Sequence, residues 1–251
     1  MTKKAWIIFV AVVVLLLGGM IYLSNKDRST ADVSKVNTNS VLPAVAGSGN
    51  IADHVFGQKN SKVTLIEYGD YQCPGCGSAY PIIKSLTEKY QGQLTFVFRN
   101  FPLTTIHPNA RVAAATAEAA GLQGKYWEMH NALYENQSDW NQLSVDKRND
   151  YFYSLASQLG LKADQFKTDF ESNVVNKKIS YDQALGKKDQ VQGTPTFFLN
   201  GKELNEYVKD GKIVPQGTDG ATPIWGDATA LDTLMLQPAF KQAGISLPSA
   251  K

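Results

Sequence analysis

The chain of 251 residues carries 25 Lys and Arg against 23 Asp and Glu, so its net charge at pH 7 is +2. The basic residues are scattered rather than grouped in a block, and this pattern gives no support for nucleic-acid binding. Hydrophobic residues make up 43% of the chain, which suits a globular domain with a sizeable core rather than a disordered protein.

The N-terminal region contains an uncharged, apolar segment over residues 5–23. At about 1.5 Å per residue, a helix of this length crosses a hydrocarbon core of about 30 Å. A cleaved signal peptide would have a shorter apolar region and a small-x-small cleavage site, so we expect a retained signal-anchor. Lys3 and Lys4 predict a cytoplasmic start, although Lys26 and Arg28 on the other side weaken this assignment of orientation.

The next segment, residues 24–52, is rich in Ser, Asn, Asp, Ala and Gly, and Pro43 interrupts it. This composition predicts a flexible linker. We therefore expect three parts: residues 1–23 as cytoplasmic start and transmembrane anchor, 24–52 as linker, and 53–251 as one globular domain with an embedded subdomain.

Cys73 and Cys76 are the only cysteines of the chain. A structural disulfide between them would close a loop of only two residues and stabilise the fold little. A zinc site needs three or four ligands, and the three histidines of the chain have no paired spacing, so we expect neither a metal nor another cofactor. Thiol-disulfide exchange is the chemistry that this spacing favours.

The residues around the cysteines predict a strand followed by a helix. Residues 63–68 form a short apolar and β-branched run, and residues 74–90 have apolar positions at helical spacing. Pro74 suits the first helical position, which leaves Cys73 at the N-cap. There the helix dipole lowers the pKa of the Cys73 thiol, while Cys76, one turn inside, suits the resolving role.

Glu67 is a carboxylate within the apolar strand, six residues before Cys73. Burying such a group is costly unless it finds a partner or its pKa rises. One interpretation is a proton acceptor for Cys76 during disulfide exchange. The other is a side chain that points away from a half-exposed strand.

The remaining elements follow in chain order. Apolar patterns predict a second strand at 94–101 and a third at 196–199, which enters a tight hairpin at Asn200-Gly201. Between these strands we expect helices at 110–120, closed by Gly121, at 126–135, after Ser144, and at 163–185. A last helix is predicted at 228–243, after a long loop at 205–227 that is either a surface decoration or a lip over a substrate groove.

Two histidines precede or lie within these helices. His107 stands before Pro108 at a helix entrance, and His130 lies on an apolar helical face. We expect both to be packed or capping residues rather than catalytic bases.

Together, the strand with Glu67, the following Asp70 and the Cys73-Pro74-Gly75-Cys76 motif resemble the DsbA-like branch of the thioredoxin superfamily. Residues 192–201 resemble the second active-site element of that family. The resemblance implies an α/β thioredoxin fold with a helical insertion at about 105–190. It also implies a cis Thr194–Pro195 bond beside the active-site dipeptide Pro74-Gly75, with the backbone of Thr194 binding substrate.

The activity implied by the resemblance is that of a thiol-disulfide oxidoreductase that introduces disulfide bonds into exported proteins. Its partners would be unfolded or partly folded exported proteins with free thiols, and a membrane quinone-linked protein, DsbB-like or VKOR-like, that reoxidises it. The catalytic domain would then lie on the extracytoplasmic side of the cell membrane, on a single-pass anchor. A disulfide reductase or isomerase, and a non-enzymatic, membrane-tethered peptide-binding chaperone with vestigial cysteines, are the alternatives.

The sequence departs from the family at Gly75, where many DsbA-like proteins carry a histidine that stabilises the thiolate. The loss of one such interaction is worth about 1.5–3 kcal/mol, or roughly 30–65 mV for a two-electron couple. We therefore expect weaker oxidising power than in relatives with that histidine.

Overall fold

The computed structural model describes residues 9, 12–15 and 31–248. The chain forms two units, 1–31 and 32–251. Within the described residues, none of the helices has the length and apolar character that a membrane span requires. The predicted transmembrane segment, residues 5–23, lies largely outside the described residues and stays a prediction.

A mixed sheet forms the centre of the second unit. Its strands are β1 (Val55–Gly57), β2 (Thr64–Gly69), β3 (Thr95–Asn100), β4 (Thr196–Leu199) and β5 (Lys202–Glu203), in the order β1-β3-β2-β4-β5. The central pair β2 and β3 is parallel, and the other neighbours are antiparallel. Asn200 and Gly201 have φ of 49° and 82°, the left-handed conformation that a tight hairpin requires, so the predicted hairpin is confirmed.

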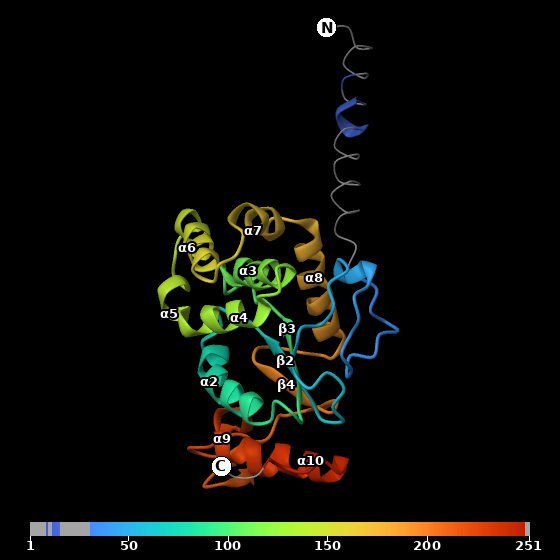
Figure 1. The fold of residues 1–251 in the computed structure, drawn as a ribbon, viewed down its shortest axis with the longest axis vertical. Coiled ribbons are helices and arrows are strands. Elements are labelled where there is room, and N and C mark those ends of the chain that lie inside the picture. Colours follow the sequence, from blue (N-terminus) through green and yellow to red (C-terminus); the bar gives the residue numbers. More distant parts are fainter. Residues whose placement is uncertain (1–8, 10–11, 16–30, 249–251) are drawn as a thin grey trace. The chain divides into compact units, whose positions relative to one another are not determined.

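Helices α2 (Pro74–Lys89) and α8 (Asn173–Lys188) cover opposite faces of this sheet (Figure 1). Successive side chains of a strand point to opposite faces, and in β2 Glu67 faces α2 whereas Tyr68 faces α8. A Cβ atom on Gly186 of α8 would lie 3.1 Å from the Tyr68 ring and 2.6 Å from the Phe101 ring. Glycine at this position therefore allows the helix to pack directly on the sheet.

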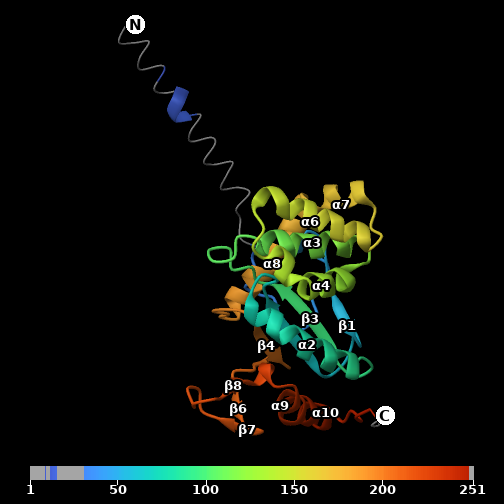
Figure 2. The ribbon, with the colours of Figure 1, turned by 90° about the vertical axis from the view of Figure 1, so that its left-hand side faces the viewer.

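Helices fill the segment between β3 and β4, as the insertion in the predicted α/β fold requires (Figure 2). They are α3 (Ala110–Leu122), α4 (Tyr126–Glu135), α5 (Gln137–Trp140), α6 (Val145–Gln158), α7 (Ala163–Phe170) and α8. The prediction of one helix at 163–185 is wrong, because the helix is interrupted between α7 and α8. The Ser172 hydroxyl caps the start of α8 by accepting a hydrogen bond from the Val175 N–H at 3.2 Å.

Helix α3 also continues past the residue that was expected to close it. Gly121 lies inside α3, which ends at Leu122. A Cβ atom at Gly121 would lie 2.7 Å from the His54 ring. The glycine therefore serves close packing against His54 rather than helix termination.

Residues 32–52, here called the N-terminal strap, pack against the domain and include the short 3-10 helix η1 (Ala46–Ser48). Val33, Leu42 and Ile51 are buried in the strap. Lys188 donates hydrogen bonds to three strap carbonyls, and Arg99 donates to two others. The prediction of a flexible linker is therefore wrong over 32–52. Cationic side chains from α8 and β3 bind carbonyl oxygens of the strap and hold it on the domain.

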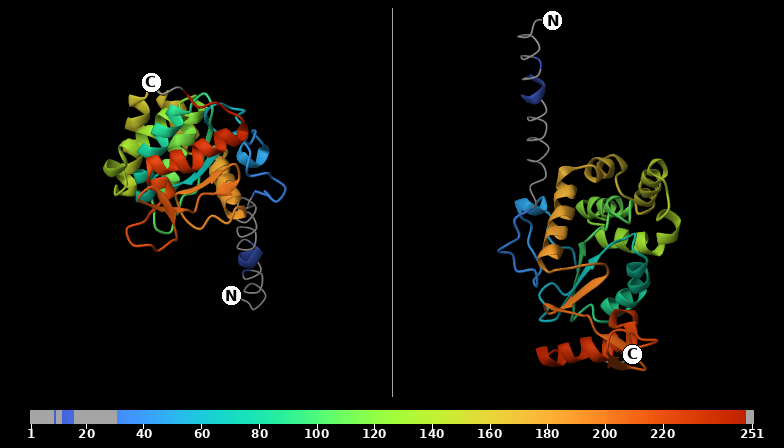
Figure 3. Two further views of the ribbon diagram at one scale, coloured as in Figure 1. Left: turned by 90° about the horizontal axis from the view of Figure 1, so that it is seen from below. Right: turned by 180° about the vertical axis from the view of Figure 1, so that it is seen from behind.

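The predicted loop 205–227 contains a small antiparallel sheet instead. Its strands are β6 (Tyr207–Lys209), β7 (Lys212–Val214) and β8 (Thr222–Pro223), in the order β7-β6-β8, and the short helix η2 (Ile224–Gly226) follows. The helical segments α9 (Ala228–Ala230), η3 (Leu231–Leu236) and α10 (Gln237–Ala243) then lie together at one end of the domain (Figure 3). Asp232 joins them to the end of α2 by accepting hydrogen bonds from Lys89 and Tyr90, each at 2.6 Å.

Candidate active site

Cys73 occupies the N-cap of α2, and Pro74 takes the first helical position. The Cys73 Sγ atom lies 3.2 Å from the Thr194 carbonyl oxygen. Hydrogen bonds from the Cys76 thiol and from the backbone N–H groups of Cys76 and Gly75 outweigh burial and lower the pKa of Cys73 to about 5. At neutral pH Cys73 is therefore a thiolate, the nucleophilic form of the residue.

Cys76 lies one turn inside α2 and is fully buried. Its Sγ accepts a hydrogen bond from the Asp70 N–H at 3.5 Å. Burial is the main cause that raises the pKa of Cys76 well above its usual value. Both cysteines are free, so the site pairs an ionised Cys73 with a protonated Cys76.

Glu67 is 4% exposed, and its side chain faces α2 rather than solvent. Burial, and next the charge of Cys73, raise the pKa of Glu67 to about 8. The interpretation of Glu67 as an outward-pointing residue is therefore wrong. When Glu67 ionises, its charge adds to burial in raising the pKa of Cys76.

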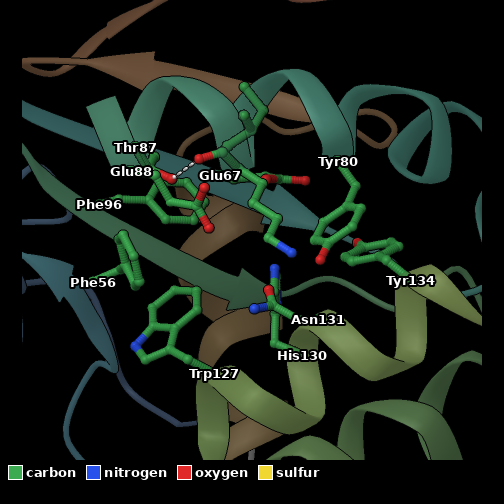
Figure 4. Close-up of a pocket in the computed structure, with 12 residues that line it drawn as sticks. Phe56, Glu67, Tyr80, Thr87, Glu88, Phe96, Trp127, His130, Asn131 and Tyr134 are labelled. Carbon is green, nitrogen blue, oxygen red and sulfur yellow. Dashed lines mark hydrogen bonds between the residues drawn. The ribbon is translucent and has the colours of Figure 1, made fainter. Parts of the chain in front are cut away.

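A small pocket connects Glu67 with the surface between α2 and α4 (Figure 4). Tyr80 and Glu88 line it from α2, and Trp127 and His130 line it from α4. Its cavity volume of about 20 Å³ has room for about one water molecule.

Replacing Glu67 with Gln should stabilise the protein above neutral pH and slow thiol exchange. The folded carboxyl has a pKa of about 8 instead of 4.5. Between these values the folded state holds a proton that the unfolded state has lost, so stability falls as pH rises. Gln does not titrate and so avoids this loss of stability. We expect Glu67→Gln to raise the free energy of unfolding by roughly 2–4 kcal/mol at pH 8 and by little at pH 4, as measured by urea unfolding.

Glu88→Gln is the matched control, since Glu88 is an exposed carboxylate at the same pocket. It should change neither the pH dependence of unfolding nor the exchange rate. Equal pH profiles for the parent and Glu67→Gln would remove Glu67 as the titrating acid of the site.

The Thr194–Pro195 peptide bond is cis, as the resemblance predicts. A Cβ atom on Gly75 would lie 3.2 Å from Pro195 Cδ and 3.6 Å from Cys73 Sγ, so the cis proline packs beside the Pro74-Gly75 dipeptide. The Thr194 hydroxyl is buried and has no hydrogen-bond partner within residues 31–248. Strand pairing of β4 with β2 brings this proline loop to the cysteines.

Other side chains at the site were missed by the sequence prediction. Gln137, on α5, donates hydrogen bonds to the carbonyl oxygens of Tyr71 and Cys73 at 2.7 and 2.9 Å. His107 Nδ1 lies 2.8 Å from Asp70 Oδ2. These contacts join segments far apart in the chain, and no local pattern marks them.

His130 is packed, as predicted. Burial lowers its pKa to about 3, and its Nδ1 lies within hydrogen-bond distance of the Tyr71 hydroxyl, at 3.0 Å. The part of the chain that the structure describes contains no group of three or more side chains suited to hold a metal ion.

Comparison with known proteins relates the chain to two groups. Curated relatives include the proteins named Na⁺/H⁺ antiporter NhaA 1 of Salinispora arenicola, 38% identical over 150 residues, and of Mycolicibacterium gilvum, 36% identical over 154 residues. Each match covers 60% of this chain but only 22% and 24% of the relative. The matched region thus spans about a quarter or less of the length of these antiporters.

Several solved structures have a similar fold. A thioredoxin-like oxidoreductase from Silicibacter pomeroyi is 26% identical, with a TM-score of 0.53 over 76% of this chain and 92% of that one. Oxidised BdbD from Bacillus subtilis is 22% identical, with a TM-score of 0.58 over 82% and 97%. The alpha-DsbA1 protein of Wolbachia pipientis is 22% identical, with a TM-score of 0.59 over 76% and 92%.

A family model described as thioredoxin matches residues 49–214. This range contains the cysteine motif, Glu67 and the cis proline. The chain therefore belongs to the thioredoxin family, and its fold is that of the DsbA-like thiol-disulfide oxidoreductases.

Proposed function

We propose that this protein is a thiol-disulfide oxidoreductase that introduces disulfide bonds into exported proteins. The opposite pKa shifts of Cys73 and Cys76 carry the proposal. A stabilised Cys73 thiolate favours the reduced protein, so the Cys73–Cys76 disulfide gives up its oxidising equivalents readily. Such a pair accepts electrons from substrate thiols.

The reaction begins with the disulfide form. A substrate thiolate attacks Cys73 Sγ, the bond to Cys76 breaks, and its electron pair leaves on Cys76. Glu67, whose pKa is raised chiefly by burial, can supply the proton that Cys76 takes up. A second substrate thiolate then attacks the substrate sulfur of the mixed disulfide and displaces Cys73 as a thiolate. The substrate loses two electrons and the protein gains them.

The substrates would be unfolded or partly folded exported proteins with free thiols. The Thr194 backbone, adjacent to Cys73 Sγ, is the proposed contact for an extended substrate segment. Reoxidation requires an electron acceptor, for which a membrane quinone-linked protein, DsbB-like or VKOR-like, is suited. We propose a single-pass anchor at residues 5–23 and an extracytoplasmic domain at the cell membrane. The ion antiporter names of the relatives support a membrane setting.

The reduction potential of the full-length protein against glutathione tests the direction of electron flow. We expect a value above the glutathione poise of roughly −220 to −260 mV, and below about −120 mV because Gly75 supplies no thiolate-stabilising side chain. A value near about −270 mV would contradict the oxidase proposal and identify a thioredoxin-like reductant.

A further inference from the structure

Asp70 connects both cysteines to the loop that follows β3. Its carbonyl oxygen accepts the Cys73 N–H at 3.0 Å, and its own N–H donates to Cys76 Sγ at 3.5 Å. Its buried carboxylate accepts the N–H of Gln72 at 2.8 Å and that of Leu103 at 2.9 Å. The orientation of the Asp70 backbone therefore determines how the cysteines are held.

His107 completes the contacts of this carboxylate. Its Nδ1 lies 2.8 Å from Asp70 Oδ2, and the side chains are 15% and 0% exposed. A carboxylate oxygen only accepts, so Nδ1 carries the hydrogen. Across residues 31–248, His107 is the sole ionisable side chain that bonds to the Asp70 carboxylate. Without it, a fully buried carboxylate would have two backbone donors only and would tend to turn toward solvent.

We propose that His107, through Asp70, is a positioning residue for the departure of Cys76 during thiol attack. This inference rests on the proposed exchange reaction. When a thiolate attacks Cys73 Sγ, the disulfide breaks and the electron pair moves to Cys76 Sγ. The Asp70 N–H donates a hydrogen bond to Cys76 Sγ and stabilises the negative charge that develops there. The bond from His107 keeps the Asp70 carboxylate, and with it this N–H, in place.

Three substitutions separate this role from a general structural one. His107→Ala removes the bond to Asp70. His107→Asn retains it, because the Nδ2 of asparagine lies the same number of bonds from Cβ as the Nδ1 of histidine. His54→Ala is the matched control, since His54 bonds to the buried Glu118 at 2.9 Å with side-chain exposures of 16% and 0%.

The measurement is the single-turnover rate at which dithiothreitol reduces the oxidised full-length protein, alongside urea unfolding. We expect His107→Ala to lower this rate about tenfold or more, the effect of losing a hydrogen bond to a charged group. His107→Asn should return the rate to within about twofold of the parent. His54→Ala should lose stability and keep the parental rate.

An unchanged rate in His107→Ala would overturn the inference. So would equal slowing by His54→Ala, which would reveal a general effect of destabilisation, or a folded His107→Asn that stays slow. The proposed function fails differently: a parent that reacts with dithiothreitol but does not oxidise a reduced protein would contradict that function and leave the role of His107 standing.

Discussion

Cys73→Ala and Cys76→Ala should each reduce the catalysed oxidation of a reduced protein to the uncatalysed rate, but for different reasons. Without Cys73 the remaining thiol is fully buried and its pKa is raised, so it should resist alkylation. Without Cys76 the nucleophile stays, and in a buffer with oxidised glutathione it should attack the glutathione disulfide, release one glutathione thiolate and keep a mixed disulfide with the other that no thiol of the protein resolves. Refolding assays and mass spectrometry of trapped adducts distinguish the two variants.

Cys76→Ala should also change the ionisation of Cys73. The hydrogen bond from Cys76 is the largest cause of the low pKa of Cys73. Its removal should move the pKa of Cys73 from about 5 back toward the ordinary thiol value, which thiolate absorbance at 240 nm follows directly.

Ser78→Ala is a suitable control for both variants. Ser78 is exposed on the same helix, and among the described residues its hydroxyl bonds only to the Pro74 carbonyl oxygen. It should retain parental activity. If Cys73→Ala still promoted oxidative refolding as the parent does, the enzymatic proposal would fail and a peptide-binding chaperone would be favoured.

The elements that sequence predicts well are those fixed by neighbouring residues. The strand, the N-cap cysteine and the proline at the first helical position lie within one short stretch, 63–76, and each follows from local spacing. The hairpin at Asn200-Gly201 follows likewise, because its left-handed residues are recognisable by type. The cis bond at Pro195 came from family resemblance, since X-Pro bonds are mostly trans in folded proteins.

The features that sequence reasoning missed depend on contacts between distant residues. His107 approaches Asp70 only because the loop after β3 returns to the cysteine loop. The N-terminal strap resembles a linker in composition, and its order depends on Arg99 and Lys188. Nothing in its own residues indicates that these cations bind its carbonyl oxygens.

Arg99→Leu should cost about 3–5 kcal/mol of stability, the usual effect of removing one partner from a buried ion pair. Arg99 is fully buried and donates to Asp53 at 2.8 Å. Although burial opposes ionisation, the charges of Lys178 and Arg99 lower the pKa of Asp53 to about 2. The pKa of Asp53 in the folded state is thus lower than its unfolded value of 3.8. The ion pair therefore stabilises the fold fully above pH 3.8, and this stabilisation is lost as the pH falls through about 2.

The same substitution should release the strap, because Arg99 also donates to the carbonyl oxygens of Thr38 and Ser40 at 2.6 and 2.9 Å. Limited proteolysis should then cleave within residues 32–52 at a protease concentration that leaves the parent intact. Arg111→Leu is the matched control, since within the described part of the chain the Arg111 guanidinium bonds only to neutral groups of α8. If Arg99→Leu lost no more stability than Arg111→Leu, the buried charges would add nothing beyond neutral hydrogen bonds. The apolar residues of the strap would then be what holds it to the domain.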